Sequence, residues 1–215
     1  MPLYKYIKKK DLLSFFSTGS LKIGTMYDYR KVETYGSVIG DQKEGYYETV
    51  LSKPEAFKFN LATDSAESRL FKGFFGSEPN PDVELSFSAG TELIIRDNSP
   101  DLYLYCMSKE FNYDVMKQFE CDCCIVIENP TAFIKEVSRV IRHKAEYIGI
   151  NSVVYGNKRT HYTTPHDVHP SLMKEEIYAP QKEVRAAWIP KGQIQGPLFV
   201  NVRKAIKYCK QIKIK

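Results

Sequence analysis

The stretch of sequence that decides the fold class is ELSFSAGTELIIRDNSPDLYLYCM, residues 84–107. Its apolar, β-branched and aromatic residues occur in three short runs, which predict strands at Glu84–Ser88, Glu92–Arg96 and Leu102–Met107. No helical pattern separates these runs. Strands that cluster in this way are typical of an α+β protein, whereas a doubly wound sheet alternates strands with helices.

Strand patterns continue on both sides of this stretch. They lie at Tyr4–Ile7, Leu21–Met26, Tyr46–Leu51, Cys123–Ile127, Val153–Tyr155, Glu183–Ile189 and Leu198–Val202. Residues 52–82 are polar and give no pattern. With no internal repeat and no linker, the sequence predicts one α+β domain, residues 1–215, with roughly eight to ten short strands.

Two segments have the periodicity of helices. The first has Asp11 as a candidate N-cap and Gly19 as a natural stop. Its apolar face consists of Leu12, Phe15 and Phe16. The second helix is expected from Asn129 to about His143. Its apolar face consists of Phe133, Ile134, Val137, Val140 and Ile141.

The composition is that of a protein with a core. The chain has 215 residues, of which 43% are apolar. No apolar run approaches the roughly 18 residues that cross a bilayer, and the N-terminal residues lack the apolar centre of a signal peptide. The five cysteines, an odd number, favour reduced thiols. We therefore expect a cytoplasmic protein without membrane contact.

The positive charge is concentrated at the two ends. Residues 1–10 carry four lysines and residues 201–215 carry six basic residues, with no acid in either segment. Because the whole chain has a net charge of +5, the interior has a net charge of −5. Such ends either meet phosphate groups or an anionic cofactor, or keep terminal strands soluble and stop them pairing edge to edge.

Two clusters contain residue types that bind metals. Cys121, Cys123 and Cys124 are too close together for the paired spacing of a zinc site, and alternation would place Cys121 and Cys123 on one face of a strand and Cys124 on the other. The second cluster lies in a proline-containing segment, and its spacing fits no standard site. Its histidines are His161, His166 and His169. We predict no metal, and the histidine segment is either a solvated loop or a loop that contacts substrate.

Several well-known catalytic motifs are missing. The sequence has no G-x-G-x-x-G, no Gly-Lys-Ser/Thr and no G-x-S-x-G, which excludes a Rossmann or P-loop nucleotide site and classical nucleophilic hydrolysis. Polar and aromatic residues gather instead at strand ends. The two-residue period of a strand places Gln181, Glu183 and Arg185 on one face. A carboxylate between an amide and a guanidinium is either a structural ion-pair ladder or a site.

Several motifs occur in an order that resembles a group of uncharacterised bacterial proteins. They are Tyr4-Lys5-Tyr6, GSLKIGTMYDYRKVE (residues 19–33), GD-x-x-EG (40–45), YCMS (105–108) and YAPQKEVR (178–185). The resemblance covers roughly residues 3–50 and 103–190. The group resembles in turn the ADP-ribosyltransferase-like superfamily, which implies a split β-sheet core with flanking helices and the use of NAD.

The resemblance also implies roles for individual residues. The late Q-x-E motif of the superfamily matches Gln181-Lys182-Glu183, which makes Glu183 the catalytic carboxylate and places Gln181 beside it. The early His or Arg of the superfamily is absent from Tyr4-Lys5-Tyr6, so Lys5 or Tyr6 would contact the cofactor. The other implied cofactor contacts are Tyr27 and Tyr29, on nicotinamide, and Arg30 and Arg185, on the pyrophosphate.

The implied function is an NAD-dependent ADP-ribosyltransferase that acts as a cytoplasmic bacterial toxin or anti-phage defence effector. Glu183 would stabilise the positive charge that develops on the ribose as the nicotinamide bond breaks. The acceptor would be a macromolecule, with nucleic acid slightly favoured over protein by the basic ends, and a partner that neutralises the protein is compatible with this role.

Two alternatives to the transferase stay open. A non-catalytic module of the same fold would bind a nucleotide or a partner, and the missing early His or Arg favours it. A nucleic-acid-binding domain would stack bases on some of the 15 tyrosines.

Overall fold

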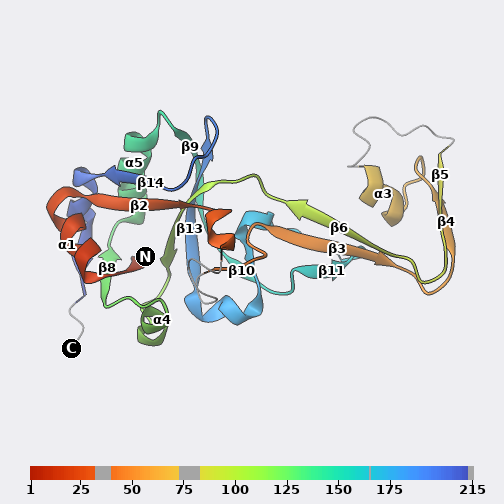
Figure 1. Cartoon of the computed structure of the whole chain (residues 1–215), viewed down its shortest axis with the longest axis horizontal. Helices are drawn as coiled ribbons and strands as arrows, with labels where there is room; N and C mark the ends of the chain where they lie inside the picture. Colours follow the sequence, from red (N-terminus) through yellow and green to blue (C-terminus); the bar gives the residue numbers. More distant parts are fainter. Residues whose placement is uncertain (32–39, 73–82, 165, 213–215) are drawn as a thin grey trace.

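The computed structural model describes residues 1–31, 40–72, 83–164 and 166–212. Figure 1 shows a body built on one large sheet, from which a long arm extends to one side. The strands of the large sheet are β1 (Leu3–Ile7), β2 (Ser20–Thr25), β7 (Tyr103–Ser108), β8 (Cys123–Ile127), β9 (Ala145–Ser152), β13 (Glu183–Pro190), β14 (Leu198–Asn201) and β15 (Cys209–Gln211).

The sheet forks at β7. Along one edge β7 pairs with β13, which pairs in turn with β9. On the other edge β2 pairs at Tyr103 and Leu104, whereas β1 pairs at Ser108. From there β2 continues to β14, and β1 continues to β8 and β15. The Lys5 amine donates a hydrogen bond to the Cys106 carbonyl, 2.7 Å away, and so provides a partner for the backbone where β1 and β2 diverge.

One face of the sheet carries the apolar core. Three helical elements pack on it: α1 (Lys9–Thr18), α5 (Pro130–Ile141) and the 3-10 helix η4 (Arg203–Tyr208). Helix α5 begins where the side chain of Asn129 accepts a hydrogen bond from the Ala132 N–H. The buried indole of Trp188 on β13 donates to Ser138 Oγ at 2.9 Å and so joins the sheet to α5.

The arm is a second, smaller sheet with a separate tip. Its strands are β3 (Tyr46–Ser52), β6 (Glu92–Asn98) and β11 (Arg159–His161), and its tip contains β4 (Phe57–Asn60), α3 (Ala66–Lys72) and β5 (Glu84–Phe87) (Figure 1). At the tip the rings of Phe57 and Phe87 stack with their centroids 5.0 Å apart. Glu67 on α3 accepts hydrogen bonds from Lys53 at 2.5 Å and from the Tyr162 hydroxyl at 2.9 Å, which ties the tip to the arm.

The remaining elements lie on the opposite face of the large sheet from the core or in the connections. They are η1 (Asp28–Arg30), α4 (Tyr113–Gln118), β10 (Val154–Tyr155), η2 (Pro170–Leu172), β12 (Met173–Lys174) and η3 (Glu176–Gln181). Among the described residues, none of the helices is long and apolar enough to cross a membrane.

The α+β class predicted from clustered strands is confirmed. Gly19 ends α1 in the left-handed conformation, with φ at 79°, as predicted. The predicted apolar face of α5 is also confirmed, because Phe133, Ile134 and Val137 are buried in the core.

Several predictions about local structure are wrong. Asp11 is not the N-cap of α1, because the helix begins at Lys9 and Asp11 lies in its first turn, where its charge favours the helix dipole. Cys121 precedes β8, so strand alternation does not reach it; it packs with Cys124 in a cluster around Tyr6, while Cys123 lies in the main core. The strands and α-helices that escaped prediction are β4, α3, α4, β9, β11, β12 and β15.

The interpretation of the basic ends as edge protection is wrong for the N-terminal strand. Strand β1 lies between β7 and β8 inside the sheet. Strand β15 does lie at an edge, and its exposed Lys210 pairs with Glu128. Residues 32–33, the end of the motif at residues 19–33, lie outside the described residues.

Candidate functional site

A pocket of about 140 Å³ opens on the sheet face opposite the core, where the forked strands meet η3 and the segment before β3. Its lining combines aromatic rings with buried charged side chains. It consists of Tyr4, Lys5, Tyr6, Tyr29, Glu44, Cys106, Met107, Ser108, Phe119, Cys121, Lys174, Gln181, Glu183 and Arg185. These residues come from distant segments of the chain, so only the fold brings them together.

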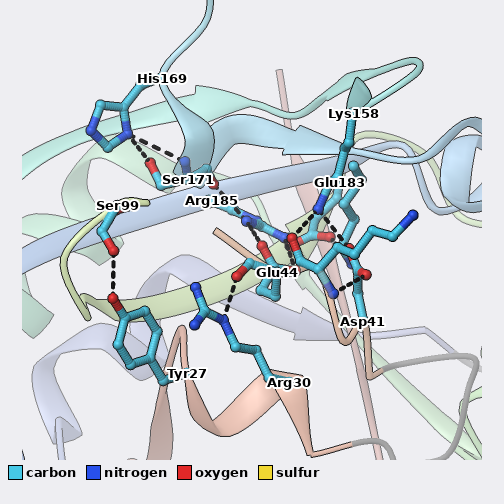
Figure 2. Close-up of polar contacts among 12 residues, drawn as sticks. Tyr27, Arg30, Asp41, Glu44, Ser99, Lys158, His169, Ser171, Glu183 and Arg185 are labelled. Atoms are coloured by element: carbon cyan, nitrogen blue, oxygen red, sulfur yellow. Dashed lines mark hydrogen bonds and ion pairs between the residues drawn. The ribbon is translucent and has the colours of Figure 1, made fainter. Parts of the chain in front are cut away.

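Arg185 occupies the centre of the polar network beside this pocket (Figure 2). It lies on β13, and only 1% of the residue is exposed. Its Nη1 and Nη2 bind the two carboxylate oxygens of Glu44 at 2.6 and 2.9 Å, and its Nε donates to Glu183 Oε1 at 2.7 Å. Nη1 also donates to the Ser171 carbonyl at 2.5 Å. A planar guanidinium with five donors suits this fork-to-fork geometry.

Glu183 is held between two cations. Its Oε2 lies 2.7 Å from the Lys174 amine, and its Oε1 accepts from Arg185. Burial alone would raise the pKa of Glu183, but Arg185 and Lys174 lower it further than burial raises it, so the pKa lies well below its ordinary value. The carboxylate is therefore ionised at neutral pH. Each oxygen retains a second lone pair for another donor.

Lys174, on β12, completes a balanced set of two cations and two carboxylates. Burial would lower the pKa of Lys174, but Glu183 and Glu44 raise it above its ordinary value. The same amine donates to Gln181 Oε1 at 3.1 Å. The charges of this network therefore balance, and Lys5 adds one further positive charge to the pocket lining.

A second buried ion pair fixes the GD-x-x-EG segment. Asp41 lies 2.8 Å from the amine of Lys158, and both side chains are buried. Gly45 has φ at 73°, and a Cβ there would lie 2.1 Å from Met26 Sδ, so the turn that presents Glu44 requires glycine. The motif therefore has a physical explanation: Asp41 anchors the segment, Gly45 turns it and Glu44 pairs with Arg185.

Six of the eight residues assigned from the sequence line the pocket: Lys5, Tyr6, Tyr29, Gln181, Glu183 and Arg185. Tyr29 lies across β2 at Gly24, where a Cβ would be 2.4 Å from the tyrosine hydroxyl oxygen. Glu183 and Arg185 share a strand face, but the prediction that Gln181 shares it is wrong. Gln181 ends η3, and Lys182 turns the chain with φ at 42°.

Tyr27 and Arg30 are outside the lining of this pocket. The Tyr27 hydroxyl donates to the Ser99 carbonyl at 2.7 Å. The Arg30 guanidinium stacks on the Tyr27 ring, 3.9 Å from its centroid, and its Nε donates to the Glu44 carbonyl at 2.6 Å. Figure 2 shows both side chains below Glu44, with Arg30 hydrogen-bonded to the Glu44 backbone.

Sequence reasoning missed Lys174, Lys158 and Tyr155. The Tyr155 hydroxyl accepts from the Glu183 N–H at 2.7 Å. A buried lysine has no distinctive spacing and looks like a surface lysine in sequence. The only available signal for Lys174 was its position seven residues before Gln181, which by itself indicates nothing.

The cysteines and histidines form no metal site among the described residues. His161 hydrogen bonds to Thr163, and His169 accepts from the Ser171 N–H at the start of η2. The ring of His166 lies 4.3 Å from that of Tyr47, and burial lowers the pKa of this histidine. The three imidazoles therefore have separate local contacts.

Comparison with protein-family models, curated proteins and solved structures finds no match to this chain. The geometry of the pocket is therefore the basis for assigning a function.

Proposed function

We propose that the pocket binds NAD and that the protein is an ADP-ribosyltransferase. The observation that carries this proposal is the convergence of Glu183, an aromatic wall and a surplus positive charge on one pocket. Ligand sites commonly combine apolar walls with a few convergent polar groups. The resemblance noted in the sequence supports the further proposal of a cytoplasmic toxin or anti-phage defence effector.

The lining fits one end of the dinucleotide. A volume of about 140 Å³ is below the roughly 300–1,000 Å³ of whole-ligand pockets, so the pocket would enclose the nicotinamide end and leave the rest at its mouth. The rings of Tyr6 and Tyr29 provide faces for nicotinamide. Lys5 would pair with an anionic group of the ligand, because among the described residues it is the cation of the lining that has no carboxylate partner.

Glu183 is suited to stabilise positive charge on the ribose. Its lowered pKa keeps it ionised, and the lone pairs left by Arg185 and Lys174 can accept a hydrogen bond from a ribose hydroxyl. Preorganised charge of this kind acts where positive charge develops in the transition state. Arg185 and Lys174 would be positioning residues, because they hold the carboxylate rather than the substrate.

The test is nicotinamide release from NAD in cell lysate, which supplies every acceptor. We expect Glu183→Gln to reduce the rate by at least about 100-fold. Glu44→Gln is the matched control, since it removes the same charge from the same network and leaves Glu183 in place. Equal rates from wild type and Glu183→Gln, with both folded, would refute the catalytic role.

One observation favours a second candidate, a non-catalytic nucleotide-binding module. Both oxygens of Glu183 are already ion-paired, as in a structural network. In that case calorimetry would detect nucleotide binding that is weakened by Lys5→Met, while the wild type releases no nicotinamide.

A further inference from the structure

A second hollow lies between the start of β9 and the connection from β13 to β14. It measures about 560 Å³. In Figure 1 the blue connection after β13 rises beside β9, and the Lys191 N–H donates to the Lys144 carbonyl at 2.8 Å. We call this hollow the Phe199 pocket; it is lined by Tyr103, His143, Lys144, Lys191, Gly192, Gln193, Gln195, Gly196, Pro197, Leu198 and Phe199.

The lining is basic and its charges are uncompensated. Among the described residues that line it there is no Asp or Glu, whereas His143, Lys144 and Lys191 are all exposed. Neither lysine forms an ion pair with any other residue in the described part of the chain. This differs from the first pocket, where all but one of the charges are paired.

An unusually exposed aromatic ring stands at the rim. Phe199 is 74% exposed on β14, an edge strand of the large sheet. Its neighbours Leu198 and Val200 pack into the core, so alternation directs Phe199 to the opposite face. Lys22, its direct partner on the neighbouring strand β2, is also exposed. A phenylalanine left in water beside several cations has no role in the packing of the core.

We propose that the Phe199 pocket binds single-stranded nucleic acid, with a base stacked on Phe199 and phosphates at Lys144 and Lys191. Exposed aromatic rings beside a positively charged groove are the means by which proteins bind single strands without reading their sequence. An extended single strand has bases next to phosphates, so one base can lie on the Phe199 ring while neighbouring phosphates lie at the lysines of the same pocket. The inference does not depend on NAD or on Glu183, although such a strand could serve as the acceptor of the proposed transferase.

The test is fluorescence anisotropy with labelled single-stranded RNA and DNA oligonucleotides, without NAD. Phe199→Ala should weaken binding about 5- to 150-fold, the equivalent of the about 1–3 kcal/mol of one base–aromatic stack. Phe199→Trp should retain binding. Ile177→Ala, which also removes an apolar side chain that is 74% exposed, is the matched control.

The lysines are tested through the salt dependence of binding. Each phosphate contact to a single strand contributes about 0.7 to the slope of log affinity against log salt, so Lys144→Ala/Lys191→Ala should reduce the slope by about 1.4. Lys58→Ala/Lys117→Ala removes equal charge elsewhere and should leave it unchanged. Absence of oligonucleotide binding, or binding insensitive to Phe199→Ala, would overturn the proposal. The proposal would also be overturned if light scattering showed a dimer that depends on Phe199 while Phe199→Ala left oligonucleotide binding unchanged.

Discussion

Replacing Arg185 with methionine removes the cation at the centre of the buried network and leaves its two carboxylates in place. Methionine keeps the length and apolar stem of the side chain, so the change is mainly one of charge and hydrogen bonds. Breaking a buried ion pair by removing one partner costs about 3–5 kcal/mol. For a chain of this size about 1 kcal/mol shifts Tm by roughly 2–4 °C, so we expect Tm to fall by about 6–20 °C.

The pH dependence distinguishes this mechanism from a simple packing defect. In the wild type the pKa of Glu183 is lowered, so its contribution to stability is fully present above the unfolded-state value of about 4.3 and is lost as pH falls toward the folded-state pKa. Without Arg185 the pKa of Glu183 rises, because Lys174 is then the one cation of the pair that still opposes the effect of burial. Protonation relieves the excess negative charge that is left in the network. The difference in Tm between the two proteins should therefore be largest at pH 7 and smaller at pH 5.

Thermal and urea unfolding at both pH values would measure the effect. Glu44→Gln in the Arg185→Met background should recover part of the lost stability, because it removes the carboxylate that loses its ion-pair partner, whereas Glu183 keeps Lys174; Glu44→Gln alone should destabilise. A loss of less than about 2 °C for Arg185→Met, or an equal loss at pH 7 and pH 5, would refute the argument from buried charge.

Three further predictions concern local structure. Gly45→Ala should destabilise by clearly more than Gly90→Ala in urea unfolding, because both sites have positive φ but only at Gly45 would the Cβ collide with a neighbouring side chain; equal losses would contradict this. The hydrogen bond from Lys53, against the opposing effect of burial, lowers the pKa of Glu67 to about 2. The stabilisation of the arm tip by Glu67 should be fully present above about pH 4.3 and weaken as pH falls toward 2, so the protection of α3 amides from hydrogen exchange should fall over the same range. Glu67→Gln should abolish this pH dependence; the same pH dependence in the variant would contradict the role of Glu67. Asn129→Ala should destabilise by about 0.5–2 kcal/mol through loss of the α5 cap, and a loss within error of zero in urea would show that the cap is dispensable.

The body of the protein could be predicted from the sequence because its strands have a regular apolar pattern. Strands β7 and β8 bury nearly every residue and have nearly continuous apolar sequences between polar segments. Strand β13 is also largely buried, and in its first half the charged Glu183 and Arg185 alternate with apolar residues. Strand β9 escaped because most of its residues are at least partly exposed and Gly149 interrupts the pattern. In the tip of the arm, β5 matches the strand predicted at Glu84–Ser88, whereas β4 and α3 escaped because they lie in a largely polar segment and pack on phenylalanines that are distant in sequence.

Only part of the candidate site could be predicted from the sequence. The strand period correctly placed Glu183 beside Arg185, and the pairing of their side chains follows from it. Nothing in the sequence showed that Arg185 would also receive Glu44 from 141 residues away. Partners that are distant in sequence carry no local signal, and the turn at Lys182 removed Gln181 from the expected strand.

The long separations within the buried network have a consequence for synthesis of the chain. Asp41 and Glu44 are made early, but Lys158 and Arg185 follow 117 and 141 residues later. Until those cations emerge from the ribosome, the two carboxylates have no buried partners and remain in water, since burial of an unpaired charge is strongly unfavourable. Strand β7 likewise cannot pair with β13 until that later strand has been synthesised. A nascent chain therefore has no assembled pocket until it has been translated past Arg185, so incomplete translation products would carry no preformed site.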